Sequence, residues 1–250
     1  MNIAVVTGAS SGMGKYFSLM IPDYFNNIDE IWLIARREDK LIGVSKYISV
    51  PCKVIKGDLC SKETYTRLSN ALNEKNVNVK LLVNCAGFGK NGTFENIAVS
   101  NDNIQSDMVN VNCTSLVRMC EVMIKYMKPG SRIINVASGS AFCPQPGFAV
   151  YAATKSFVLS FSRAVGMELK KKKIYVTAVC PGPVDTEFFN TAGNITSPVK
   201  KLVMAKPEKV VKKALNDSLK KKELSVYGMS IKLSHIVSKI IPHKLIMRFF

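Results

Sequence analysis

Residues 3 to 14 of this 250-residue chain read Ile3-Ala4-Val5-Val6-Thr7-Gly8-Ala9-Ser10-Ser11-Gly12-Met13-Gly14. The first four are an apolar run typical of a buried strand, and the glycines are spaced Gly-x-x-x-Gly-x-Gly where a helical pattern begins. Glycines let backbone N–H groups approach a phosphate closely, and the N-terminus of a helix favours its negative charge. This stretch therefore predicts a strand, a dinucleotide-binding turn and a helix.

Part of the same stretch also matches a different pattern. Gly8 to Gly12 is a literal Gly-x-Ser-x-Gly, which in hydrolases places a nucleophilic serine at a strand-to-helix turn. That interpretation leaves Gly14 without a role, and only two histidines, His235 and His243, are available to complete a triad. Dinucleotide binding accounts for all three glycines and is the favoured interpretation.

Short apolar runs alternate with helical patterns along the rest of the chain. Strands are expected at residues 3–7, 30–35, 52–57, 80–85, 131–137, 174–180 and, from a weaker pattern, 223–227. Helices are expected at 12–25, 38–48, 62–76, 101–128, 151–172 and 207–221. Strands separated by helices favour right-handed crossovers. The predicted fold class is α/β, a Rossmann-like doubly wound parallel sheet of about seven strands with helices on both faces, plus a C-terminal helical tail.

The end of the second predicted strand bears on which dinucleotide is bound. In NAD-binding proteins an acidic residue about 20 positions past the glycines holds the ribose 2′-hydroxyl. Here Ala35 is followed by Arg36 and Arg37, whose charge and forked donors suit a 2′-phosphate, and Ser11 could donate as well. The pattern favours NADP(H) over NAD(H). The alternative is two solvated arginines at the start of a helix.

Tyr151 and Lys155 form a candidate acid/base pair. Residues four apart lie on the same face of a helix, and the region 151–172 has a helical pattern. An ammonium group beside a phenol favours the phenolate, so Lys155 is expected to lower the pKa of Tyr151 from its usual value of about 10. Tyr151 would then act as a general acid/base near neutral pH.

Six sets of residues now stand in a fixed order, each at the expected element. They are Thr7 to Gly14; Asp58-Leu59 after the third strand; Asn84-Cys85-Ala86-Gly87; Asn112 within Val111-Asn112-Cys113; Ser138, 13 residues before Tyr151; and Pro181-Gly182-Pro183-Val184-Asp185-Thr186. With Tyr151 and Lys155, they resemble the short-chain dehydrogenase/reductase family over residues 1 to about 228. Cys85 departs from the family's Asn-Asn-Ala-Gly motif, and residues 187–205, where the family usually sets specificity, carry no readable motif.

The resemblance implies a catalytic tetrad of Asn112, Ser138, Tyr151 and Lys155. Tyr151 would exchange a proton with the substrate oxygen, Ser138 would polarise the carbonyl, and Asn112 would hold a water that links Lys155 to solvent. Taken singly, Ser138 could instead cap a turn and Asn112 could be a buried polar residue that bends a helix.

The resemblance also implies which residues bind the cofactor. Lys155 would bind the nicotinamide ribose, and Thr186 with the Val184 backbone would fix the carboxamide. The full expected set is Gly8, Ser10, Ser11, Gly12, Met13, Gly14, Arg36, Arg37, Asp58, Leu59, Asn84, Ala86, Gly87, Tyr151, Lys155, Pro181, Gly182, Val184 and Thr186.

Aromatic residues follow several of the predicted strands. They are Phe88, Phe142, Phe148, Phe188 and Phe189. Open α/β sheets bind ligands at the C-terminal ends of their strands, so these rings predict a pocket for an apolar ketone or secondary alcohol, such as a steroid, bile acid, acyl chain or quinone-like ring. Ordinary core packing is the alternative.

Residues 229–250 lie beyond the resemblance and are treated as an amphipathic C-terminal extension of a catalytic domain at 1–228. Apolar residues recur at helical spacing until Pro242 interrupts them, and the charges between them argue against a membrane span. Three roles stay open: a subunit contact, a lid over the substrate pocket, or a peripheral contact with an anionic membrane.

Charge and cysteine content limit the remaining possibilities. The net charge is +17, and residues 200–250 hold 13 Lys and Arg against 3 Asp and Glu. Nucleic-acid binding is not expected, because this basic region lacks interleaved aromatic residues on which bases could stack. Seven unpaired-looking cysteines and the absence of a signal peptide favour a cytoplasmic protein, with membrane association left open. No metal site is expected.

The predicted function is an NADP(H)-dependent oxidoreductase that interconverts a ketone and a secondary alcohol on a small, apolar substrate. The family commonly forms homodimers or homotetramers, and the same is expected here. Two alternatives stay open: a non-catalytic NADP(H)-binding sensor or scaffold, and a family member that carries out epimerisation or dehydration.

Overall fold

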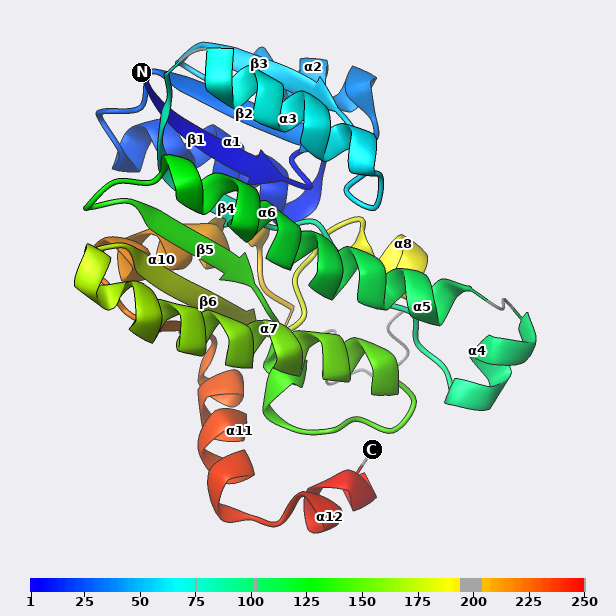
Figure 1. Ribbon diagram of the computed structural model, residues 1–250. Helices are drawn as coiled ribbons and strands as arrows, with labels where there is room; N and C mark the ends of the chain where they lie inside the picture. The colour runs from blue at the N-terminus through cyan, green and yellow to red at the C-terminus, as the bar shows by residue number, and fades with distance from the viewer. Residues whose placement is uncertain (75, 101–102, 194–203, 250) are drawn as a thin grey trace.

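The computed structural model describes residues 1–74, 76–100, 103–193 and 204–249. One seven-stranded sheet runs through its centre in the order β3-β2-β1-β4-β5-β6-β7, with every neighbouring pair parallel (Figure 1). The strands are β1 (Asn2–Thr7), β2 (Glu30–Ala35), β3 (Cys52–Lys56), β4 (Asn78–Asn84), β5 (Arg132–Val136), β6 (Tyr175–Pro181) and β7 (Leu224–Tyr227). The predicted fold class is confirmed, including the weakly patterned seventh strand.

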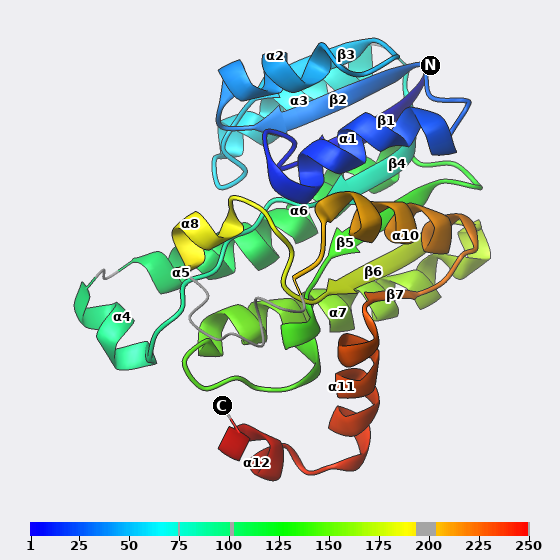
Figure 2. The same ribbon diagram turned by 180° about the vertical axis from the view of Figure 1, so that it is seen from behind.

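Helices cover both faces of the sheet. One face packs against α3 (Lys62–Glu74), α6 (Ser115–Met123) and α7 (Ala149–Leu169), and the other against α1 (Gly12–Tyr24), α2 (Glu38–Ser45) and α10 (Pro207–Leu219) (Figures 1 and 2). The strand order reverses between β1 and β4, because the chain moves outward from β1 in both directions. Ligands of doubly wound sheets bind at such a switch point, beyond the C-terminal ends of the strands.

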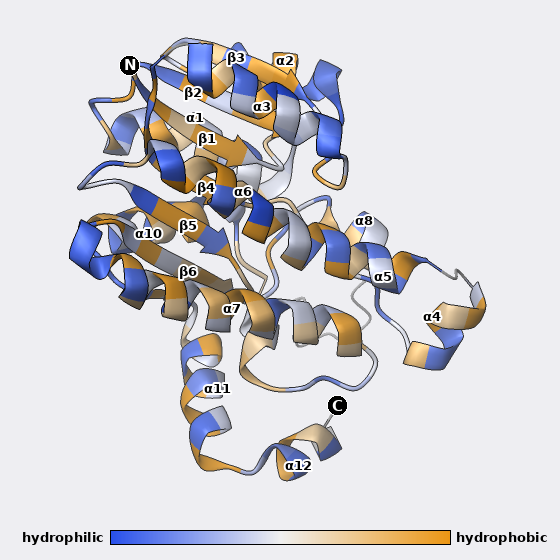
Figure 3. Cartoon of the chain, viewed as in Figure 1, coloured by the Kyte–Doolittle hydropathy of each residue, from blue (hydrophilic) through white to orange (hydrophobic). Residues whose placement is uncertain are grey.

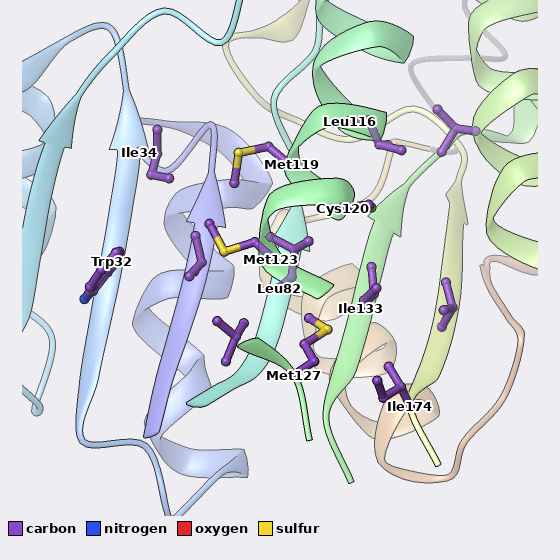
Figure 4. Close-up of a cluster of buried hydrophobic side chains, with 14 of the residues drawn as sticks. Trp32, Ile34, Leu82, Leu116, Met119, Cys120, Met123, Met127, Ile133 and Ile174 are labelled. Carbon is purple, nitrogen blue, oxygen red and sulfur yellow. The ribbon is translucent and has the colours of Figure 1, made fainter. Parts of the chain in front are cut away.

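Strand residues alternate between two apolar cores, as the two-residue period of a strand requires. Trp32 and Ile34 of β2 face the core beneath α3 and α6, whereas Ile31 and Leu33 face the core beneath α1 and α2. Figure 4 shows the first core, with side chains of β2, β4 and β5 beside those of α6. Because both faces are buried, the strands read as continuous apolar runs.

The helix expected at 101–128 is the main error of the sequence prediction. Residues 101–102 lie outside the described part, and the rest divides into α5 (Ile104–Val109), a π-helical segment (Asn110–Thr114), α6 and a 3₁₀ turn (Ile124–Tyr126). Apolar periodicity does not distinguish these helix types, and the π segment coincides with Asn112, whose side chain bonds outside its own helix. Two short helices, α4 (Phe94–Ser100) and α8 (Phe188–Ala192), were not predicted.

After β7 the chain forms α11 (Met229–Ile240), then α12 (His243–Ile246) and a 3₁₀ turn at Met247–Phe249. Pro242 separates the two helices, as expected from its missing N–H. The seven cysteines all lie in the described part and are free thiols. Among the helices that the structure describes, none is both long and apolar enough to cross a membrane.

Candidate active site

The turn between β1 and α1 is shaped to receive a phosphate group. Gly8 has a φ of +67°, and a Cβ added there would lie 2.9 Å from the backbone N of Ala86. A Cβ on Gly14 would lie 2.2 Å from the Gly8 carbonyl oxygen, so no other residue fits either position. The first turn of α1 contains no acidic residue. Its N-terminus is therefore able to accept an anion, and these residues fit the pyrophosphate of a dinucleotide.

Thr7 fastens the turn after β4 to this phosphate-binding turn. Its hydroxyl oxygen accepts hydrogen bonds from the backbone N–H groups of Cys85 and Ala86, at 3.1 and 3.2 Å. Asn84, in contrast, points into the core, where its Nδ2 donates to Asn135 Oδ1 at 2.9 Å. The Asn84 side chain therefore supports β4 and β5, and only the backbone of this motif borders the site.

The end of β2 carries the two arginines expected to select the cofactor. The Arg37 guanidinium donates to Ser10 Oγ at 3.2 Å and forms an ion pair with Glu187 at 2.9 Å. Arg36 is exposed. At the end of β3, the Asp58 side chain accepts from the backbone N–H of Cys60 at 2.9 Å, and Leu59 is buried.

Tyr151, Ser138 and Lys155 meet beyond the C-terminal ends of β5 and β6. Ser138 lies two residues after the end of β5 and caps the 3₁₀ turn Gly139–Phe142, where its Oγ accepts from Ser140 N at 3.1 Å. Tyr151 lies in the first turn of α7 and is 7% exposed. Lys155 lies one turn further on, and its Nζ donates to the Val136 carbonyl at 3.0 Å. Three members of the expected tetrad therefore lie together around one cavity.

Burial controls the protonation of both titratable members. It raises the pKa of Tyr151 to about 12, a rise that a hydrogen bond with Ser138 partly opposes. Burial also lowers the pKa of Lys155. The Lys155 ammonium lies 5.7 Å from the centre of the Tyr151 ring and bonds to Val136. The expected lowering of the tyrosine pKa is not found in this arrangement: burial of the phenol raises its pKa, and the Lys155 ammonium is hydrogen-bonded to Val136 O.

Asn112 holds the turn after β4 against α7. Its Oδ1 accepts from Phe88 N at 3.0 Å, and its Nδ2 donates to Phe88 O at 2.9 Å and to Thr154 Oγ1 at 3.0 Å. The Thr154 hydroxyl in turn donates to Tyr151 O at 2.8 Å. The amide therefore connects the backbone of two active-site segments, and the bent π segment around it brings it within reach of both.

A cavity of about 510 Å³ joins these segments. Nine of the predicted residues line it: Met13, Gly87, Ser138, Tyr151, Lys155, Pro181, Gly182, Val184 and Thr186. The remaining predicted residues, including Asn112, Arg36, Arg37 and Asp58, are outside its lining. Across the described residues, no three His, Cys, Asp or Glu side chains are grouped to hold a metal ion.

Several lining or supporting residues were not predicted as site residues. Phe148 stacks on Tyr151 with ring centres 4.2 Å apart, and Phe188 lies 5.5 Å from the same ring. Both aromatics were expected near the pocket, but not against the catalytic phenol. Ser234 and Val237 of α11 also line the cavity. Their helical spacing was visible in the sequence, but spacing does not show which surface a helix packs on.

A family model described as short chain dehydrogenase matches residues 2–195. The chain belongs to this family. The resemblance found in the sequence is thereby confirmed, and the chain is an oxidoreductase-family protein whose site fits a nicotinamide cofactor.

Similar proteins agree with this placement. Human 17-beta-hydroxysteroid dehydrogenase type 3 is 30% identical over 197 residues, which cover 75% of this chain and 62% of that protein, so the match spans less than two thirds of that relative. Zebrafish (Danio rerio) very-long-chain 3-oxoacyl-CoA reductase-B is 30% identical over 254 residues, covering 98% and 78%. A short-chain dehydrogenase from Sphingobium yanoikuyae, solved with NADPH, has a TM-score of 0.79 at 22% identity, covering 100% of this chain and 96% of that one.

Proposed function

We propose that this protein is an NADP(H)-dependent oxidoreductase that interconverts a ketone and a secondary alcohol on a lipophilic substrate. One observation carries the proposal: Tyr151, Ser138 and Lys155 line a single cavity that also contains Met13 of the phosphate-binding turn. A proton donor, a hydroxyl able to polarise a carbonyl and a residue that borders the phosphate-binding turn therefore line one cavity.

Each residue has a definite task in this reaction. The nicotinamide supplies or accepts the hydride, for which the chain has no group of its own. The Tyr151 phenol gives its proton to the carbonyl oxygen during reduction and takes it back during oxidation. Ser138 would donate to the same oxygen, and Lys155, whose Nζ donates to Val136 O, would bind the nicotinamide ribose.

The preference for NADP(H) rests on charge at the end of β2. Ala35 ends this strand where an NAD-binding protein would carry a carboxylate, and Arg36 and Arg37 follow it. Arg37 already contacts Ser10 of the phosphate-binding turn, at 3.2 Å. Arg36 is exposed beside it. Two guanidinium groups at this position would neutralise a 2′-phosphate and donate to its oxygens.

The lipophilic substrate is inferred from the cavity wall. Phe142, Phe148, Phe188 and Phe189 line it, together with Val237 and Ile246. A volume near 510 Å³ falls within the range of pockets for small molecules. The names of two relatives specify a hydroxysteroid and a very-long-chain 3-oxoacyl-CoA, and the steroid skeleton and the acyl chain are both apolar.

The test is consumption of NADPH, with NADH in parallel, against a panel of steroid ketones, 3-oxoacyl thioesters and small polar ketones. We expect consumption of NADPH with apolar ketones and little consumption of NADH. Equal use of NADH would refute the role of the two arginines. Binding of NADPH without turnover on any ketone would favour a sensor or scaffold over an enzyme.

A further inference from the structure

One side of α11 presents a continuous apolar stripe to solvent. Its members are Met229, Leu233, Ile236 and Ile240, which are 79%, 62%, 55% and 75% exposed; they are called the outer stripe below. Positions i, i+4, i+7 and i+11 fall within about 60° of one another on a helix that turns about 100° per residue. Four large apolar side chains on one line, all exposed, are unusual for a surface that faces only water.

The opposite side of the same helix is held by the protein. Ser234 and Val237 line the cavity, and Ile231 packs so closely on the β6 loop that a Cβ on Gly182 would lie 2.9 Å from it. The His235 ring lies 4.4 Å from Phe142, which also lines the cavity. These contacts fix the rotation of α11, so the outer stripe is directed away from the protein.

The charged residues that flank the outer stripe in the sequence are all positive. Lys232, Lys239, Lys244 and Arg248 accompany it, and the sequence contains no Asp or Glu after Glu223. Figure 3 shows hydrophilic and hydrophobic segments interleaved along α11 and α12. Ile241 and Leu245, on either side of Pro242, are also exposed, by 40% and 46%. An apolar face bordered only by basic residues has the composition of helices that lie in the surface of an anionic bilayer.

We propose that the outer stripe and its flanking basic residues form a docking surface for an anionic lipid membrane. A second copy of the chain is the less favourable partner, because a twofold interface would place this surface against itself. Lys232 and Lys239 would then face the same lysines of the other copy, with no carboxylate after Glu223 to separate them. Anionic lipid headgroups complement these charges, and the acyl region accepts the stripe.

Docking in this way places one wall of the cavity at the membrane surface. One side of α11 lines the cavity, and the outer stripe, which would contact lipid, is rotated from that side by roughly a third of a turn about the helix axis. An apolar substrate dissolved in the bilayer would reach the cavity without crossing bulk water. This consequence rests on the proposed function, but membrane binding itself does not, and it can be measured without turnover.

The test is sedimentation of the full chain with vesicles of phosphatidylcholine alone and of phosphatidylcholine with added phosphatidylserine. We expect binding to the mixed vesicles that weakens in high salt. The double variant Leu233→Glu/Ile240→Glu should lose at least about tenfold in binding. Ile42→Glu/Tyr47→Glu adds the same two carboxylates at exposed sites on α2 and just after it, at the other end of the sheet from β7, and should bind as the unmodified chain does.

A second variant tests the proposal independently, in case the first variant misfolds. Lys232→Glu/Lys239→Glu leaves every apolar residue in place and should remove the preference for phosphatidylserine. NADPH binding by all variants shows that they are folded. The proposal is overturned if the unmodified chain ignores both vesicles, or if the outer-stripe variant binds as well as the control. It is also overturned if the chain dimerises through the stripe without lipid. In that case the unmodified chain would be a dimer and the Leu233→Glu/Ile240→Glu variant would be a monomer.

Discussion

Arg37 and Glu187 form an ion pair of 2.9 Å that connects the end of β2 to the start of α8. Arg37 also donates to Ser10, and the hydrogen bond from Arg37 is the main reason that the pKa of the Glu187 carboxyl is lowered. One guanidinium therefore contacts the phosphate-binding turn and the segment that borders the substrate cavity. A 2′-phosphate bound at Arg37 has to compete with this carboxylate.

Glu187→Gln is expected to tighten NADPH binding by about two- to fivefold, since both partners of the pair are roughly half exposed and such pairs contribute about 0.2–1 kcal/mol. NADH lacks the 2′-phosphate, so its affinity should change little. Fluorescence titration of both cofactors measures the difference. Glu38→Gln, which breaks the exposed pair with Lys56 at 3.8 Å, is the matched control. An equal gain for NADH would show that Arg37 does not contact the 2′-phosphate.

Tyr151→Phe should reduce turnover by a factor of about 10² to 10⁴, because it removes the proton donor but keeps the ring. The ring of residue 151 stacks on Phe148 and borders Phe188, so the phenylalanine should keep the pocket shape. NADPH affinity is expected to stay within about twofold of the original, since the phosphate-binding residues are untouched. Steady-state kinetics and a binding titration test the two halves separately. Turnover that survives the substitution would remove Tyr151 from the mechanism.

The pH dependence of the two directions should differ. Oxidation needs the Tyr151 phenolate, and burial raises the pKa of this group to about 12. The rate of oxidation is therefore expected to rise about tenfold per pH unit without a plateau below about pH 10, whereas reduction, which needs the phenol, should not fall over the same range. Ser138→Ala should move the rise to higher pH, because the Ser138 hydrogen bond lowers this pKa. A plateau near neutral pH would instead show that the Lys155 charge governs the phenol.

The positions in the fold that the sequence predicted are those set by neighbours that are local in the chain. The glycines at 8, 12 and 14 lie within one strand-to-helix turn, and Tyr151 and Lys155 lie one helical turn apart. Alternating apolar runs set the seven strands, since burial on both faces leaves a long apolar signature. Ser138 could be placed because it lies within two residues of the end of β5, a strand whose apolar run is clear in the sequence.

What could not be predicted depends on distances between remote segments. Glu187 lies in a stretch with no readable motif, and its pairing with Arg37 requires β2 and the β6 loop to be adjacent. The direction of the tyrosine pKa could not be predicted because the spacing of Tyr151 and Lys155 does not report the burial of the phenol, which raises this pKa. The π segment around Asn112 escaped notice because it keeps the apolar pattern of an ordinary helix.

Asn112→Ala should lower the free energy of unfolding by about 1–3 kcal/mol, because the N–H and C=O of Phe88 both lose their partner. Urea unfolding measures this loss. Asn216→Ala removes one exposed amide bond, to Lys212 O at 2.9 Å, and should change stability by no more than about 0.5 kcal/mol. Equal stability of the two variants would contradict the structural role of Asn112.

The same variant separates the two roles considered for Asn112. If its task is to hold a water beside Lys155, kcat should fall while stability and cofactor affinity stay unchanged. If its task is to fasten the turn after β4, the free energy of unfolding should fall, and cofactor affinity should fall with it. Gly87 of that turn lies close to both Asn112 and Lys155, because a Cβ on Gly87 would be only 2.8 Å from Asn112 Oδ1 and 3.4 Å from Lys155 Nζ. The three hydrogen bonds to Phe88 and Thr154 engage both ends of the amide, and so we expect the second outcome.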